Sequence, residues 1–216
     1  MSVEPVHPYK LASILLQYPD GPVLEAREEI AGAARELPAG RQGDAIRDFA
    51  EWFGQQPVDE LQRRYVETFD FVRRSSLYLT YHLLGDRRHR GMALLTLKQR
   101  YTAAGLELDD RELPDFLPVM LEFAALAPEP GIELLGRHRD ALELVRASLH
   151  ESASPWGMLI DAVCAPLPGL TRAQVARIRR LAREGPPDEE VGLEPFAPPE
   201  MMPGAQGAPT AMPRGV

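Results

Sequence analysis

Apolar side chains recur every three to four residues along most of this chain, and this spacing constrains the fold more than any other feature of the sequence. In residues 87–104, for example, Leu94, Leu97 and Tyr101 lie on one face of a helix, and Gly105 is well suited to end it. Similar segments follow one another, and none has the strict alternation of a clear β-strand. The sequence therefore predicts an all-α fold, a single-domain bundle of about ten helices.

Proline and glycine punctuate the helical pattern and give the expected boundaries. The expected helices cover residues 7–18, 22–37, 44–55, 57–69, 87–104, 115–127, 132–150, 154–164 and 171–183. The weakly alternating residues 77–81 are interpreted as a short helix or an irregular turn, because their neighbours on both sides are helical. Residues 106–114 are predicted to form an acidic connecting loop.

The composition changes at residue 185. Eight of the 21 prolines and five of the 17 glycines fall in the last 32 residues. Such a segment buries too little apolar surface to offset the entropy lost on ordering. The sequence therefore predicts a helical domain over residues 1–184 and a disordered, Pro/Gly-rich tail over residues 185–216.

Charge and composition exclude several classes of protein. The net charge of −8 disfavours a general nucleic-acid binder, whose binding surface is basic. One cysteine and five scattered histidines give neither an internal disulfide nor a standard zinc site. The first residues do not have the pattern of a signal peptide, and no apolar run approaches the ~18 residues of a membrane span. We therefore expect a cytoplasmic protein without stable membrane insertion.

Motifs of common catalytic sites are missing from the sequence. It contains no GxGxxG or GxxxxGK[ST] phosphate loop, and no HExxH, CxxC or GxSxG. Cys164 stands between Val163 and Ala165, where a small buried hydrophobe is expected rather than a reactive thiol. We therefore expect a binding protein that is not an enzyme and carries no cofactor or metal.

Residues 65–91 are rich in aromatic and charged side chains and hold the first candidate binding residues. Tyr65 and Phe69 share one helical face, and with Tyr78 they would suit a groove for an apolar helix. Side chains of this kind more often belong to a core, and that alternative stays open. Asp70 lies off the face, where it can meet water or a partner.

Charged residues at the end of this stretch extend the candidate set. His82 and Asp86 are four residues apart and pair if the helix continues through Gly85; a purely structural pair is the alternative. Arg87 and Arg90 open a helix, where positive charge opposes the helix macrodipole. They are therefore expected to hold an anion or a carboxylate, unless they form an ordinary solvated face.

A short acidic motif follows further along the chain. Glu112 and Asp115 bracket Leu113 and Pro114. One interpretation is an acidic lip that holds a basic peptide. The other is a loop acid followed by Asp115 as the N-cap of the next helix.

Two further functions remain as alternatives. Residues 171–183 carry five arginines and could form a helix that enters a DNA major groove, although the net charge argues against it. A small acid–base enzyme could use His82, Glu112 and Asp115, but nothing in the sequence positions a substrate.

Several segments together resemble a known family. YVETFDF, SLYLTYHLLGDRRHRG, ALLTLKQRYTAAG and ELPDFLPVMLEF are similar to the NarJ-type assembly chaperones of respiratory nitrate reductase, within the wider TorD-like group. The opening KLASILLQYPD resembles the family's first helix, and the similarity covers residues 9–149. Two motifs mark the binding region in the wider group, Tyr-x-x-Leu-Phe and Glu-x-Pro-Asp-His. The matching residues here are Tyr65, Phe69, Glu112, Pro114 and Asp115. Thr68 replaces the leucine of the first motif, and Phe116 replaces the histidine of the second.

The resemblance implies an all-helical cytoplasmic chaperone for the apo alpha (catalytic) subunit of nitrate reductase. Such a chaperone binds the subunit's N-terminal peptide, a vestigial twin-arginine-like segment. It holds the subunit until molybdenum cofactor and iron–sulfur centres are installed, and it is not part of the final enzyme. The resemblance leaves open whether the cofactor-delivery machinery is a further partner and whether the client is another molybdoenzyme. The expected peptide-binding residues are Tyr65, Phe69, Asp70, Tyr78, His82, Asp86, Arg87, Arg90, Glu112, Pro114 and Asp115.

Overall fold

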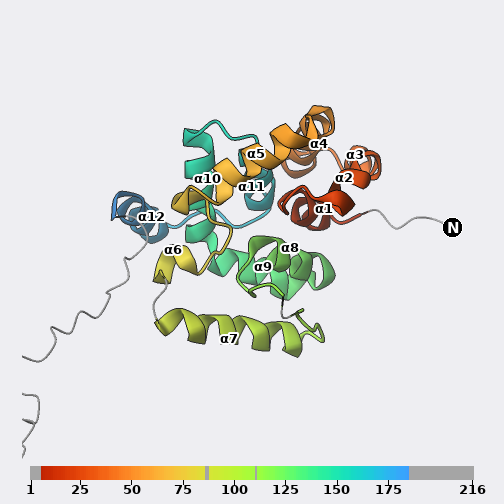
Figure 1. The fold of residues 1–216 in the computed structure, drawn as a ribbon. Helices are drawn as coiled ribbons and strands as arrows, with labels where there is room; N and C mark the ends of the chain where they lie inside the picture. The colour runs from red at the N-terminus through yellow and green to blue at the C-terminus, as the bar shows by residue number, and fades with distance from the viewer. Residues whose placement is uncertain (1–5, 86–87, 110, 185–216) are drawn as a thin grey trace, which may run out of the picture.

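The computed structural model describes residues 6–85, 88–109 and 111–184. Within these ranges the chain forms twelve α-helices and one 3₁₀-helix, so the expectation of an all-α fold is confirmed (Figure 1). The first helices are α1 (Pro8–Leu15), α2 (Gly21–Glu25), α3 (Arg27–Glu36), α4 (Arg41–Gln55), α5 (Val58–Phe69), the 3₁₀-helix η1 (Arg73–Ser75) and α6 (Tyr81–Leu84). The others are α7 (Arg88–Ala103), α8 (Leu117–Leu126), α9 (Pro128–Arg137), α10 (Arg139–Glu151), α11 (Gly157–Cys164) and α12 (Arg172–Glu184). The predicted tail lies outside the described residues.

Helix α1 lies in the middle of the bundle, where it packs against α3, α4, α8 and α11. Pro8 opens the helix at a position where no backbone N–H is needed. Leu11 and Leu15 are fully buried, and the Ser13 hydroxyl donates a hydrogen bond of 2.8 Å to the Pro118 carbonyl. That bond fixes the beginning of α8 against α1.

Trp156, just before α11, is the centre of an aromatic core. Its ring centroid lies 5.8 Å from that of Phe49, 5.8 Å from that of Tyr65 and 5.6 Å from that of Phe69. Its indole N–H donates to the Leu15 carbonyl at 3.3 Å. These contacts join α1, α4, α5 and α11, and edge-on ring pairs of this kind add to the stability gained from burial.

Two of the predicted helices are wrong in length. Residues 132–150 do not form one helix, because α9 ends before His138 and α10 begins after it. The His138 ring donates from Nδ1 to the Leu134 carbonyl at 3.0 Å and so competes with the backbone for that acceptor. Residues 22–37 also form two helices, α2 and α3, which meet at Ala26, and no proline or glycine there signals the break.

Helices α8 and α9 meet at a close corner. Helix α8 ends at Leu126, just before Pro128, as predicted, and Pro128 and Pro130 lie in the first turn of α9, where proline is tolerated. Gly131 lies directly against α8, since a Cβ built on it would be 2.2 Å from the Cα of Ala124. The corner therefore requires glycine at residue 131.

Helix α7 runs along one edge of the bundle and is packed more loosely (Figure 1). Among its described side chains only Leu97 and Tyr101 are buried, while Met92 and Leu95 are 65% and 49% exposed. Along the described ranges, no helix has the length and apolar character needed to cross a bilayer.

Candidate functional site

Two loops far apart in the sequence pair side by side, and this pairing builds the site. Tyr78 and Phe116 form an isolated antiparallel bridge, and their ring centroids are 5.1 Å apart. The Leu79 N–H donates to the Asp115 carbonyl at 3.0 Å, and the Leu117 N–H donates to the Leu77 carbonyl at 2.8 Å. The segment before α6 is thereby fixed against the segment before α8, which joins the two sequence motifs in space.

Asp115 is fully buried within this pairing, at 0% exposure. Its Oδ2 accepts hydrogen bonds from the Thr80 backbone N–H at 3.2 Å, from the Thr80 hydroxyl at 2.5 Å and from Arg90 Nη2 at 3.3 Å. Arg90 Nε also donates to the Thr80 hydroxyl at 3.2 Å. We call Thr80, Arg90 and Asp115 the Asp115 cluster. Several charge-assisted hydrogen bonds of this kind are what allow a carboxylate to be buried.

This geometry corrects both sequence interpretations of Asp115. The residue is not the N-cap of α8, because Phe116 occupies that position and no side chain caps the helix. It is also not part of an exposed acidic lip, because its carboxylate points inward to Thr80 and Arg90. The Arg90 side chain is only 16% exposed, so this arginine binds an internal carboxylate rather than an external anion.

Two tyrosines fasten the acidic loop around this cluster. The Tyr78 hydroxyl donates to Glu112 at 2.9 Å, and the Tyr101 hydroxyl donates to the Pro114 carbonyl at 2.6 Å. Burial, followed by the hydrogen bond to Glu112, raises the pKa of Tyr78 to about 12. Burial also raises the pKa of Tyr101, so both hydroxyls keep their protons and act as donors. Glu112 and Pro114 are thus held in fixed positions.

Tyr65 and Phe69 face the core rather than an open groove. Both rings are buried beside Trp156, and the Tyr65 hydroxyl donates to the Leu16 carbonyl at 3.0 Å. Asp70, directly after α5, is exposed. Burial raises the pKa of Tyr65, and the nearby charges of Asp70 and Glu112 add to the increase. These residues are therefore neighbours of the acidic loop, but the two rings give a partner almost no surface.

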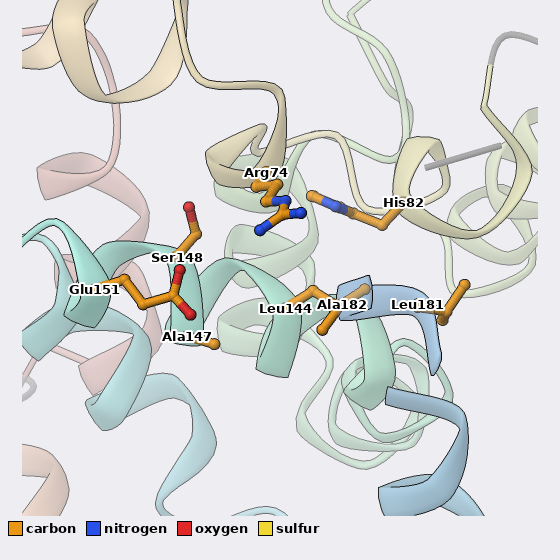
Figure 2. A pocket seen from close by; sticks show the side chains of 8 residues that line it. All are labelled: Arg74, His82, Leu144, Ala147, Ser148, Glu151, Leu181 and Ala182. Atoms are coloured by element: carbon orange, nitrogen blue, oxygen red, sulfur yellow. The ribbon is translucent and has the colours of Figure 1, made fainter. Parts of the chain in front are cut away.

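His82 is buried and has a different partner from the predicted one. Its Nε2–H donates to the Ser76 carbonyl at 2.8 Å, and burial lowers the pKa of its ring. The helix does not continue to residue 86, because α6 ends at Leu84 and Gly85 adopts a φ of 57°. The predicted residues Asp86 and Arg87 lie outside the described part of the chain. Figure 2 shows the His82 ring at a small cavity between η1, α10 and α12.

An apolar groove with acidic walls lies beside the cluster and has a cavity volume of about 320 Å³. We call it the acidic groove. It is lined by Tyr101, Leu106, Glu107, Leu108, Asp109, Glu112, Val119, Glu122, Phe123 and Leu126. Leu126 is 62% exposed at its edge, so its side chain is accessible to a partner. The sequence analysis missed this groove, although the alternation of leucine and acid in Leu106-Glu107-Leu108-Asp109 is a usable signal for it.

The acidic groove carries more acidic than basic side chains. Among its described lining residues four are acids and none is basic, and two of the four acids have a basic partner beside the groove. Arg111 donates to Asp109 at 2.5 Å and lowers the pKa of that carboxyl, while Lys10 forms an ion pair with Glu122. Across the described ranges, no three His, Cys, Asp or Glu side chains are grouped to hold a metal ion. The groove chemistry suits an apolar helix face flanked by basic side chains.

Comparison with known proteins assigns the chain to a family. A family model described as "Nitrate reductase delta subunit" matches residues 35–160, which is more than half of the chain. The chain belongs to this family. The matched range of this delta-subunit family member contains both the Asp115 cluster and the acidic groove, whereas α12 lies beyond it.

Curated relatives carry names that refer to nitrate reductase, and two of the three described here are named as assembly chaperones. NarJ of Escherichia coli K12, a nitrate reductase molybdenum cofactor assembly chaperone, is 35% identical over 158 residues, which is 70% of this chain and 65% of NarJ. The probable NarJ chaperone of Bacillus subtilis is 30% identical over 160 residues, covering 74% of this chain and 87% of its own length. The nitrate reductase-like protein NarX of Mycobacterium tuberculosis is 39% identical over 165 residues, 72% of this chain but only 24% of NarX. The chain thus spans about a quarter of NarX and just under two thirds of E. coli NarJ. The NarJ-type resemblance seen in the sequence is confirmed.

Proposed function

We propose that this member of the delta-subunit family is a cytoplasmic chaperone dedicated to nitrate reductase and is not an enzyme. It binds the apo alpha (catalytic) subunit through the N-terminal segment of that subunit. It keeps the subunit competent for insertion of molybdenum cofactor and iron–sulfur centres, and then leaves. The observation that carries this proposal is the acidic groove, present in a chain whose relatives from E. coli and B. subtilis are named as molybdenum cofactor assembly chaperones.

The groove accounts for recognition of the client segment. A segment that folds into an amphipathic helix on binding can lay its apolar side on Leu106, Val119 and Leu126, which are partly or largely exposed. Its basic side chains then meet Glu107 and Asp109, which adds specificity and a faster association rate. Folding on binding costs ordering entropy and keeps the affinity moderate, as a chaperone that must release its client requires.

The Asp115 cluster has a positioning role in this mechanism. Glu112 belongs to the groove wall, and Tyr78 fixes its carboxylate at 2.9 Å. Tyr101 forms part of the groove and also holds the Pro114 carbonyl. The cluster anchors both ends of this arrangement, because Asp115 directly follows Pro114 and Thr80 lies two residues after Tyr78. The acidic wall is thereby prepared before the client arrives, which reduces the entropy lost on binding.

Two finer points belong to the same proposal. The molybdenum cofactor is cargo of the client and needs no binding site on this chain, and the cofactor-delivery machinery is a further partner. A related molybdoenzyme is the alternative client. No observation favours a DNA-binding function, because α12 packs its apolar side against α10 and Arg177 forms an ion pair with Asp140.

The test is calorimetry with a synthetic peptide that copies the N-terminus of the reductase alpha subunit. We expect the wall variant Glu107→Lys to weaken binding by about tenfold, since it replaces an attraction by a repulsion. Leu126→Asp removes apolar contact at the groove edge and should weaken binding at least as much. Glu28→Lys, on exposed α3, is the matched control and should bind as the wild type does. The acidic groove is not the client site if all four proteins bind the peptide equally.

A peptide from the N-terminus of a related molybdoenzyme decides the identity of the client. The proposal expects the nitrate reductase peptide to bind more tightly, with an affinity that falls as salt is added. Equal affinity for both peptides would contradict a chaperone dedicated to nitrate reductase.

A further inference from the structure

Helix α12 covers part of α10 without burying any of its own residues. It packs against α10, as Figure 1 shows, and its apolar side chains Val175, Ile178 and Leu181 are only partly buried. Arginines surround this stripe, at residues 172, 177, 179, 180 and 183. A 13-residue helix of this kind is marginal in water and depends on the surface on which it lies.

The surface beneath α12 contains a buried carboxylate. Asp140, in the first turn of α10, is 1% exposed, and neither of its side-chain oxygens accepts a hydrogen bond within the described structure. Its ion-pair partner is Arg177 of α12, whose side chain remains 53% exposed. A buried carboxylate is costly without a cation, and a guanidinium suits it because it is weakly hydrated. The presence of Arg177 is therefore what makes the burial of Asp140 tolerable.

The packing beneath the end of α12 is incomplete. A cavity of about 30 Å³, room for one water molecule, lies under its last turn. Figure 2 shows Leu144 and Ala147 of α10 on one side of the cavity and Leu181 of α12 on another. Arg74 and Glu151 also reach the cavity, so its wall is partly polar. Such loose packing suits a helix that another helix can replace, rather than a helix of the core.

We propose that the α10 surface under α12 is a second docking site, and that its partner is an arginine-bearing amphipathic helix of another protein. Helix α12 occupies the site within the chain and masks it. Asp140 selects the arginine, and the stripe of Leu144 and Ala147 takes the apolar side chains that follow it. In α12 these are Ile178 and Leu181, one and four residues after Arg177. The site uses no residue of the acidic groove and goes beyond the proposed function.

Masking by α12 has a measurable consequence. A tethered helix competes at a high effective concentration, so a partner helix binds only when α12 is released. The apparent affinity is reduced by the fraction of time for which the site is free. A substitution that weakens the contact of α12 with α10 therefore increases the affinity for a partner helix, whereas a substitution of Asp140 lowers that affinity.

The experiment uses the full chain and a fluorescent peptide with the sequence of residues 171–184, followed by anisotropy. We expect the Arg177→Ala chain to bind this peptide at least about tenfold more tightly than the wild type does. The reason is that its own α12, which competes for the site, has lost the ion pair with Asp140. Arg179→Ala is the matched control, since Arg179 forms no ion pair in the described structure, and it should bind as wild type does. Adding Asp140→Asn to the Arg177→Ala chain should abolish the gain. A peptide that itself carries Arg177→Ala should also lose the gain.

Amide hydrogen exchange on the same proteins gives a second measurement. Exchange over residues 172–184 should be faster in Arg177→Ala than in Arg179→Ala, and the peptide should slow exchange in α10. The inference is overturned if the two variants bind the peptide alike, if none binds it, or if Asp140→Asn has no effect. The reductase peptide, titrated into the same variants, should bind all of them equally. A failure of the proposal for the acidic groove would therefore be recognised separately from a failure of this inference.

Discussion

The hydroxyl of Thr80 donates a hydrogen bond of 2.5 Å to Oδ2 of Asp115, across 35 positions of sequence. The backbone N–H of Thr80 donates to the same oxygen at 3.2 Å. One residue thus uses both its donors on one buried carboxylate. The contact fixes the loop before α6 to the loop before α8. The position of the acidic wall of the groove depends on how these two loops are aligned.

Replacing Asp115 with asparagine should lower the free energy of unfolding by about 3 kcal/mol, because the buried hydrogen bonds lose the negative charge that strengthens them. Urea unfolding followed by circular dichroism measures the change. Asp109→Asn is the control, because Asp109 and its partner Arg111 are both exposed, and its unfolding midpoint should equal that of wild type. Equal losses in the two variants would contradict a structural role for the Asp115 cluster.

Replacing Gly131 with alanine should destabilise the protein by about 1–3 kcal/mol, because the new Cβ overlaps the backbone of Ala124 and the two helices must separate. Gly136 offers a matched control in the same helix, since a Cβ there meets nothing within 4 Å. Gly136→Ala should stabilise by up to about 1 kcal/mol through helix propensity. Thermal or urea unfolding of both variants measures the two changes in stability. The close contact between α8 and α9 is disproved if both substitutions change the stability in the same direction.

His82 should make stability depend on pH. Its folded-state pKa lies below the ordinary histidine value of 6.5 because burial disfavours the charged ring, and the same holds for the pKa of His138. The unfolded chain therefore takes up these protons first. Stability from the neutral rings is fully present above pH 6.5 and is lost as the pH falls below that value, by up to about 1.4 kcal/mol per pH unit for each histidine.

The measurement is urea unfolding at pH values from 7.5 to 5.5. His82→Gln retains a side-chain N–H donor for the Ser76 carbonyl but does not titrate. Its free energy of unfolding should fall less steeply with decreasing pH than that of the wild type. Identical slopes would show that His82 is not responsible.

Cys164 should be unreactive in the folded protein. Burial raises the pKa of its thiol to about 12, and the side chain is 5% exposed. Few thiolates form at pH 8, so modification by a disulfide reagent should be at least about a thousandfold slower than in the urea-unfolded chain. Fast labelling of the native protein would show that α11 is not packed as described.

Local periodicity determined how much of this fold could be predicted. The predicted boundaries of α4, α5 and α7 lie within three residues of the observed ones, and α4 and α5 bury clear apolar faces. The break at His138 depends on a side-chain hydrogen bond to a backbone carbonyl, which no apolar pattern reveals. Prediction by pattern is strongest where burial alone decides the structure.

The candidate site was harder to predict, because long-range pairing creates it. Sequence spacing cannot show that Tyr78 lies opposite Phe116, or that Asp115 points to Thr80. The motif residues Tyr65 and Phe69 were correctly located on one helical face, but only the position of Trp156 shows that this face is internal. A peptide-binding role for the individual motif residues stays a prediction.

The attachment of α7 has one more consequence. Arg90 near its beginning and Tyr101 near its end both bind the same two-residue segment, through Asp115 and the Pro114 carbonyl. Because α7 is held at both ends by the same short segment, it cannot rotate about one contact while the other is intact. Helix α7 and the loop ahead of α8 should therefore move together or detach in a single all-or-none step, so that the groove they share has an intact form and an opened form with no stable intermediate.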